Sequence, residues 1–323
     1  MTTTGTLRRS IALALAVATV SLSSATGAQA STAVTRPRPH WASGTYVGSG
    51  DVAAQADFGR FRHRATDVAS TYMRYDSWDT IAHFTYMLDS LAGYRGAVSV
   101  AVPMLPADGS STFADVVAGQ HDEEFRSLAR NVVASGRGDA YIRLGWEFNG
   151  NWYPWAANNP AAYKAAFRRE VTVLRSVAPG LRIEWDGNLG YSQVGHDPMR
   201  DLYPGDDVVT IVGVDAYDNE WEHVHDQASW TAFQQGDGGL QRWLDFARRH
   251  HKKFAIPEWG LVASGGGDNP YFIQKMHDFL LRNARAIAYE CYFNTANADT
   301  RSSLTGPALN RRSAALYARL WQR

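Results

Sequence analysis

The sequence predicts a single-domain (β/α)8 barrel, the TIM-barrel fold. Eight short apolar runs alternate along the chain with segments of helical periodicity. The runs are continuously apolar and do not alternate with polar residues, which is typical of strands buried on both faces of a parallel sheet. An open, doubly wound sheet is the structural alternative, and the count of eight strands favours the barrel.

The predicted strands are runs rich in valine, isoleucine, alanine and aromatic residues. They cover residues 44–48, 70–75, 97–105, 140–146, 181–186, 208–217, 253–259 and 286–293. Neither an internal repeat nor a low-complexity linker interrupts them, so we expect one domain.

Two of the predicted helices begin with an Asn–Pro pair, in which Asn serves as the N-cap and Pro fills the first helical position. Asn159 and Pro160 start a helix that runs to Val177, and Asn269 and Pro270 start another. On the first helix, apolar side chains at three-to-four spacing form the face expected to pack on the barrel: Tyr163, Phe167, Val171 and Leu174. Further helical patterns cover residues 123–134 and 240–249.

The N-terminus resembles a secretory signal peptide. Arg8 and Arg9 precede an apolar run over residues 11–22, and Ala28-Gln29-Ala30 matches the A-x-A cleavage pattern. We expect residues 1–30 to be removed by cleavage after Ala30 and the protein to be secreted. The apolar run is too short to span a bilayer, so no membrane association is expected after cleavage. Residues 31–40 would form a flexible lead, and residues 41–323 the barrel.

Composition narrows the classes of partner. Lys plus Arg and Asp plus Glu both number 32, so no net charge attracts nucleic acid. Cys291 is the only cysteine, which excludes an intramolecular disulfide. The 11 Trp and 15 Tyr suit a cleft with aromatic walls, on which the flat apolar faces of sugars stack. We expect a monomer that binds a carbohydrate.

Two carboxylates follow strands whose ends face each other across the barrel mouth. Glu147 follows the fourth strand, between Trp146 and Phe148, and Glu258 ends the seventh, between Pro257 and Trp259. Barrels of this kind carry their chemistry at the C-terminal ends of the strands. The two side chains are therefore expected to converge.

Paired carboxylates are the minimal machinery for glycoside hydrolysis. One must be protonated to assist the leaving oxygen, and the other must be ionised to attack the anomeric carbon. Apolar neighbours such as Trp146 and Phe148 raise the pKa of a carboxyl group, whereas a nearby cation lowers it. The Arg143 side chain is expected to point to the strand face that lines the mouth, where it would be the cation beside Glu258.

Three segments in the expected order resemble glycoside hydrolase family 26, the β-mannanase family of the retaining (β/α)8 clan. "RLGWEFNGNWYPW" resembles its acid/base segment, "YPGDDVVTIVGVDAY" its sixth-strand segment, and "PEWG" its nucleophile segment. The resemblance implies that Glu147 is the general acid/base and Glu258 the nucleophile. It also implies that Arg143 and Tyr217 hydrogen-bond the nucleophile.

Sugar contacts are expected from the aromatic residues of the same segments. The resemblance implies that Trp152 and Trp155 flank the sugar subsites. Trp146 departs from the family pattern, which has His at this position, or Asn in the wider clan. On the eighth strand, Tyr292 or Phe293 replaces the usual Trp platform. Further candidates for sugar contact or for support of the carboxylates are Asn149, Trp185, Asp215 and Trp259.

Several alternatives remain open at this point. The expected substrate is a β-mannan, with xylan, β-glucan or a bacterial wall glycan as alternatives for the same chemistry. A non-catalytic carbohydrate-binding barrel is an alternative of another class. A metal-dependent hydrolase would need a histidine site, but the spacing of His223, His225 and the pair His250-His251 fits no zinc pattern, so we expect no metal or cofactor.

Overall fold

The computed structural model describes residues 41–83, 85–219, 223–298, 300–306 and 310–322. The predicted signal peptide and the predicted lead lie outside these described residues. Within them, no helix combines the length and the apolar character needed to cross a membrane.

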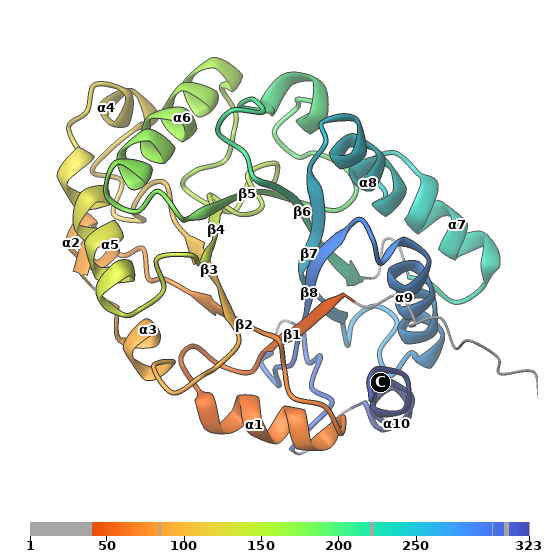
Figure 1. The fold of residues 1–323 in the computed structure, drawn as a ribbon. Helices are drawn as coiled ribbons and strands as arrows, with labels where there is room; N and C mark the ends of the chain where they lie inside the picture. Colours follow the sequence, from red (N-terminus) through yellow and green to blue (C-terminus); the bar gives the residue numbers. More distant parts are fainter. Residues whose placement is uncertain (1–40, 84, 220–222, 299, 307–309, 323) are drawn as a thin grey trace, which may run out of the picture. The chain divides into compact units, whose positions relative to one another are not determined.

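Eight parallel strands close into a barrel (Figure 1). Each strand pairs with the next in the sequence, and β8 pairs with β1 to complete the ring. The strands are β1 Ala42–Tyr46, β2 Val68–Tyr72, β3 Ala97–Val102, β4 Tyr141–Leu144, β5 Arg182–Asn188, β6 Ile211–Asp218, β7 Lys253–Leu261 and β8 Ile287–Phe293. The predicted (β/α)8 barrel is confirmed, and the open doubly wound sheet is wrong because the closed ring has no edge strand.

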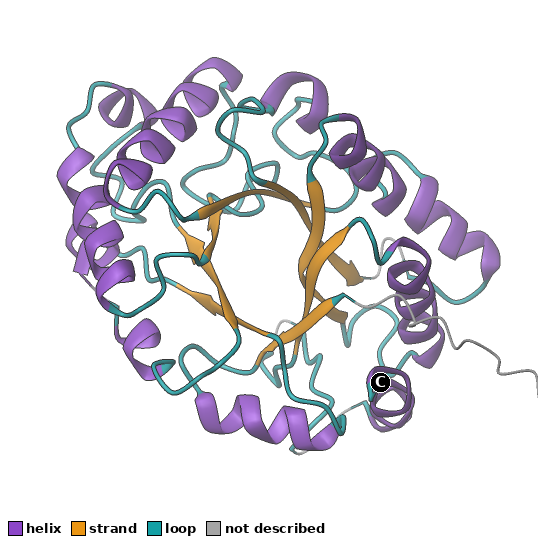
Figure 2. Cartoon of the chain, viewed as in Figure 1, coloured by secondary structure: helices purple, strands orange, loops and turns teal. Residues whose placement is uncertain are grey.

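Helices surround the barrel on its outer side (Figure 2). They are α1 Val52–Phe61, α2 Trp78–His83, α3 Tyr86–Ser90, α4 Phe113–Val117, α5 Asp122–Ala134, α6 Pro160–Val177, α7 Gln227–Gln235, α8 Leu240–Arg249, α9 Pro270–Asn283 and α10 Arg311–Trp321, with a π-helical turn η1 at Pro198–Leu202. The predicted end of α6 and both predicted ends of α8 match the structure.

Both Asn–Pro signals start helices in the predicted way. The Asn159 side chain accepts a hydrogen bond from the Ala162 backbone N–H at 3.1 Å. Asn269 does the same for Phe272 at 3.2 Å. Each bond satisfies one of the N–H groups that a helix leaves without an internal partner. The predicted packing face of α6 is buried, as its spacing indicated.

Several strand ends differ from the prediction, and the difference at β4 bears directly on the site. The strand ends at Leu144, two residues before the predicted end. Gly145 follows with a positive φ of 59°, which takes the chain out of the extended conformation. A Cβ at this position would also lie 2.5 Å from Met104 Sδ. Glu147 therefore stands in a turn beyond the strand, where its position depends on tertiary contacts.

Side chains on each strand alternate between the barrel interior and the layer beneath the helices. One interior cluster consists of Val68, Ile211, Ala255, Tyr289 and Cys291. On β5, Trp185 faces the outer layer, where its ring packs against Trp243 and Phe246 of α8. This alternation decides which predicted site residues reach the mouth.

Candidate active site

Glu147 lies in a strained turn at the mouth of the barrel. Its φ is 53°, in the left-handed region that side chains other than glycine rarely adopt. The Glu147 N–H donates to Asp186 O at 2.8 Å, and its carbonyl accepts from the Gly150 N–H at 2.9 Å. Trp155 Nε1 supports the same turn by donating to Trp146 O at 2.8 Å. Backbone strain held by such contacts is concentrated at functional sites.

Glu258 is surrounded by hydrogen-bond donors. Tyr217 OH donates to Oε1 at 2.5 Å, and Tyr72 OH donates to Oε2. Arg143 Nη2 lies 3.5 Å from Oε2. Burial and the nearby charge of Glu258 raise the pKa of both tyrosine hydroxyls well above the usual range, so each keeps its proton and donates it. This environment stabilises negative charge on Glu258.

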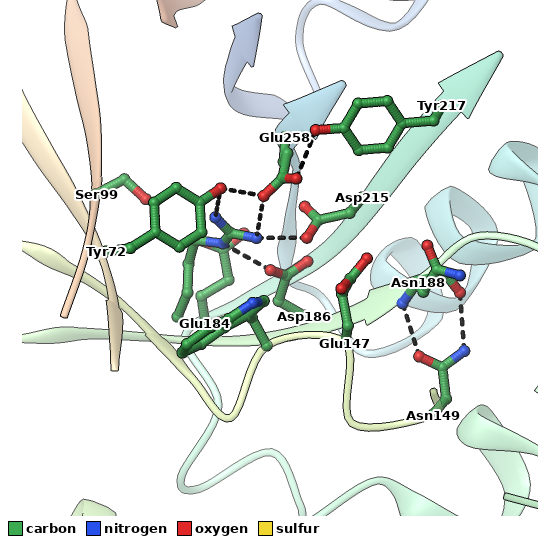
Figure 3. Close-up of polar contacts among 12 residues, drawn as sticks. Tyr72, Ser99, Glu147, Asn149, Glu184, Asp186, Asn188, Asp215, Tyr217 and Glu258 are labelled. Atoms are coloured by element: carbon green, nitrogen blue, oxygen red, sulfur yellow. Dashed lines mark hydrogen bonds and ion pairs between the residues drawn. The ribbon is translucent and has the colours of Figure 1, made fainter. Parts of the chain in front are cut away.

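Glu147 has the opposite electrostatic environment. Burial and then the charge of Glu258 raise the pKa of Glu147 to about 8. Trp152 Nε1 donates to Glu147 Oε2 at 2.9 Å and partly opposes this shift. Figure 3 shows both carboxyl groups in one cluster of polar side chains. The pair thus combines a carboxyl that holds its proton at neutral pH with a second one that is surrounded by donors.

Arg143 is buried and contacts several members of this cluster. Its Nε donates to Asp186 Oδ2 at 2.7 Å, and Nη2 donates to Asp215 Oδ2 at 2.5 Å. Nη1 donates to Tyr72 OH at 3.1 Å, which aligns that hydroxyl with Glu258. Because a guanidinium is rigid and planar, these contacts fix the direction of the donor that faces Glu258.

Arg143 is surrounded by more carboxyl groups than its single positive charge could neutralise if all of them were ionised. Burial raises the pKa of Asp186 to about 6 and that of Asp215 well above its usual value. Below them in the barrel, burial and the charge of Asp186 raise the pKa of Glu184 to about 8, and Tyr289 OH donates to Glu184 Oε2 at 2.5 Å. The interior therefore retains protons on some of these groups at neutral pH, which lowers the cost of burying them.

The residues of the acid/base segment occupy different depths. Trp152 is 44% exposed and stands at the surface beside Glu147. Trp146 is buried, and its ring contacts Tyr72 and Tyr75 edge-on. Asn149 is also buried and pairs with the backbone of Asn188 through both side-chain atoms, at 2.8 and 2.7 Å. Of these three residues, only Trp152 presents its ring to solvent at the mouth.

Four predicted aromatic site residues are fully buried: Trp155, Trp185, Trp259 and Tyr292. Burial excludes direct sugar contact for Trp155 and Tyr292, which were expected at the subsites, and it leaves Trp185 and Trp259 the supporting alternative of their prediction. Trp259 points outward from β7 because its neighbour Glu258 points into the mouth, and strand side chains alternate. Asp215 is likewise buried, and it contacts Arg143 in place of a sugar hydroxyl.

The mouth contains one functional candidate that sequence reasoning missed, and it also decides between the two residues expected on the eighth strand. Tyr72, at the end of β2, donates to Glu258 but was not among the predicted residues. Phe293 takes the place expected for Tyr292, because its ring lies 6.0 Å from that of Tyr217 and 6.2 Å from that of Tyr72. The alternation of side chains along β8 could have indicated this choice. Glu290 and Tyr292 both point to the outer face, so Phe293 points into the barrel.

The candidate histidines on the loop after β6 contact an aspartate and each other. His223 Nδ1 lies 3.4 Å from Asp218 Oδ1, and its ring stacks on His225. Among the residues that the structure describes, no three histidine, cysteine or acidic side chains are grouped so that they would hold a metal ion.

Comparison with known proteins agrees with this geometry. The model of glycosyl hydrolase family 26 matches residues 140–237. Endoglucanase H of Acetivibrio thermocellus is 25% identical over 203 residues, 60% of this chain and 22% of that protein. A mannan endo-1,4-beta-mannosidase of Bifidobacterium adolescentis is 26% identical over 212 residues, 61% of this chain and 20% of that protein. The chain thus spans about a fifth of the length of these curated relatives.

Solved structures show the same fold. GH26C from a Muricauda species superposes with a TM-score of 0.68 at 16% identity, covering 88% of this chain and 86% of the other. The catalytic domain of a Bacillus GH26 endo-beta-1,4-mannanase gives a TM-score of 0.65, with the same identity and coverage.

Proposed function

We propose that the chain, whose residues 140–237 match the model of glycosyl hydrolase family 26, is a secreted retaining glycoside hydrolase that cuts β-glycosidic bonds in a polysaccharide. Glu258 is the nucleophile and Glu147 the general acid and base. One observation carries the proposal: the carboxyl groups of Glu147, in the turn after β4, and of Glu258, on β7, lie in one mouth in opposite electrostatic environments.

In the first step, Glu258 attacks the anomeric carbon while the bond to the leaving oxygen breaks. Glu147 gives its proton to that oxygen, so the leaving group departs as a neutral alcohol. Glu258 becomes a glycosyl ester, and its lost charge removes the main charged neighbour of Glu147. The pKa of Glu147 then falls, which suits its next role as a base.

In the second step, Glu147 takes a proton from water, and the hydroxide oxygen attacks the same carbon. The ester bond to Glu258 breaks, and the carboxylate returns to the donors on Tyr72, Tyr217 and Arg143. Two inversions at one carbon give overall retention of configuration.

We propose a β-1,4-mannan as the substrate. The relative from Bifidobacterium adolescentis is named a mannan endo-1,4-beta-mannosidase, which supports this choice, while the name of Endoglucanase H keeps a β-glucan as the second candidate. Trp146 occupies the position at which the family pattern has histidine. Indole donates through one N–H and accepts nothing, so the site offers fewer contacts to a sugar hydroxyl there. Reducing ends released from mannan, glucan, xylan and bacterial wall glycan, measured side by side, test the assignment.

The proposal of secretion is supported by the N-terminal sequence. Arg8 and Arg9, the apolar run and the Ala28-Gln29-Ala30 pattern have the order of a signal peptide. Expression of the full chain in a secreting host tests it: the mature protein in the medium is expected to begin at Ser31.

Replacing Glu147 by alanine is expected to slow cleavage of the natural glycan by about 10²–10⁴-fold, the usual contribution of a general acid. An aryl glycoside with an acidic phenol leaves without proton donation, so formation of its glycosyl-enzyme should be largely preserved. Rapid-mixing measurement of phenol release separates these steps. Equal loss of this burst and of glycan cleavage would contradict the role of Glu147 as the acid.

The rate of the wild-type enzyme should also depend on pH through the same group. Because Glu147 acts first as an acid and its pKa is raised to about 8, kcat/KM should fall as the pH rises through about 8. This alkaline decrease should be absent in Glu147→Ala.

A non-catalytic carbohydrate-binding barrel would instead bind the glycan and release no reducing ends at any pH.

A further inference from the structure

A pocket of about 230 Å³ lies beside the proposed catalytic site, between two loops. Residues 190–197, which follow β5, form one wall, and residues 237–243, at the start of α8, form the other. Because the first wall follows the carboxyl end of a barrel strand, the pocket opens on the face that carries Glu147 and Glu258.

The β5 loop is fixed to the turn that carries Glu147. Asn149, two residues after Glu147, pairs with the backbone of Asn188, and its carbonyl accepts from the Gln193 N–H at 2.8 Å. On the other side, the Gly190 N–H donates to Gly238 O at 3.1 Å. Gly238 has a φ of 76°, and a Cβ there would lie 2.0 Å from Gly190 O. The close approach of the two backbones thus depends on glycine and holds the pocket walls together.

Tyr191 stands on this anchored loop with its side chain 82% exposed. It is the most exposed tyrosine or tryptophan among the residues that the structure describes, and it lines the pocket. Trp152, the other exposed aromatic residue of this region, donates to Glu147 itself. An aromatic ring left in water on a fixed loop is suited to the apolar face of a sugar.

The carboxylates and guanidinium groups that line the pocket already have ion-pair partners. Arg242 forms ion pairs with both Asp197 and Asp237. Asp197 also accepts from the backbone N–H groups of Met199 and Arg200, each at 3.0 Å. Arg200 pairs with Asp201 at 2.8 Å. A lining of paired charges offers many hydrogen-bonding atoms without a strong net field, which favours a neutral polyhydroxylated ligand over an ion.

We propose that this pocket, with Tyr191 as its aromatic wall, binds a sugar residue of the polysaccharide on the leaving-group side of the bond that is cut. The inference rests on the proposed function. The leaving-group side is inferred from the hydrogen bonds that join the β5 loop to the turn of Glu147. Glu147 protonates the leaving oxygen, and the next sugars of the leaving chain extend beyond that oxygen.

Tyr191→Ala is expected to raise KM for the polysaccharide about three- to tenfold, the size of one aromatic contact, with little change in kcat. Tyr191→Phe is the matched control, because it keeps the ring, and it should behave like the wild type. With an aryl β-mannobioside, whose leaving group is a single phenol, both variants should match the wild type. Unchanged KM for the polysaccharide in Tyr191→Ala, or an equal loss on the aryl substrate, would overturn the inference.

A binding measurement separates this inference from the proposed function. In the Glu258→Ala background, calorimetric titration with β-1,4-mannohexaose should show about three- to tenfold weaker binding when Tyr191 is also alanine. If the wild type turns over mannan but Tyr191 affects neither KM nor binding, only the pocket assignment fails. If the wild type cleaves no glycan while the Tyr191 effect on binding persists, the proposed hydrolase activity fails and the sugar site stands.

Discussion

Glu258→Ala is expected to lower kcat on every glycoside by at least about 10⁴-fold, because no other group replaces the covalent step. The side chain leaves a space faced by Tyr72, Tyr217 and Arg143, whose donors remain directed at it. Added azide should enter this space, attack the anomeric carbon once and restore part of the activity, giving a glycosyl azide of inverted configuration. Steady-state rates and the configuration of the azide product check this prediction.

Glu123→Ala provides the control for Glu258→Ala. Glu123 lies on α5, its side chain is 66% exposed, and it pairs with Arg130 at the surface. The same chemical change there should leave the rate unchanged. If the two variants had similar rates on the natural glycan, Glu258 would not be the nucleophile.

Glu290→Ala is expected to destabilise the protein by about 3–5 kcal/mol, because three buried indole N–H groups would lose their acceptor. Glu290 is fully buried on the outer face of β8. Its Oε1 accepts from Trp321 at 2.9 Å and from Trp41 at 3.3 Å, and its Oε2 accepts from Trp259 at 2.5 Å. One carboxyl group thus joins α10, the residue before β1 and the strand that carries Glu258.

Urea unfolding followed by tryptophan fluorescence measures this effect as a lower midpoint. Trp321→Phe is the matched control: it removes one of the three donors and keeps an aromatic ring in the stack with Tyr317. It should cost about 1–2 kcal/mol and leave Glu290 with two partners. A loss below about 1 kcal/mol for Glu290→Ala would show that the three indole contacts contribute little to the fold.

Much of the fold follows from local sequence signals. Continuous apolar runs identified the eight strands, and the Asn–Pro pairs at residues 159–160 and 269–270 identified two helix starts. These signals are local, because they depend on strand burial and on N-cap chemistry. The end of β4 was misplaced because it depends on Gly145 and its contact with Met104, which are far apart in sequence.

The site was only partly predictable for a related reason. Glu147 and Glu258 could be proposed as a pair because the sequence indicated both the strands that carry them and the chemistry that paired carboxylates perform. Whether an aromatic side chain is buried or exposed could not be predicted, since this depends on which face of the strand the side chain occupies. Trp259 and Tyr292 face the helices and are buried, whereas Phe293 and Tyr72 face the mouth. The role of Tyr72 further depends on barrel closure, which brings β2 within reach of β7.

The central claim is that Glu147 and Glu258 cut the bond by two successive displacements at one carbon. Proton NMR of the first product formed from a β-mannan oligosaccharide, recorded before mutarotation, tests it most directly. The account predicts that the new reducing end appears first as the β anomer and only later equilibrates. First appearance of the α anomer would mean a single displacement by water, and Glu258 would then not be a covalent nucleophile.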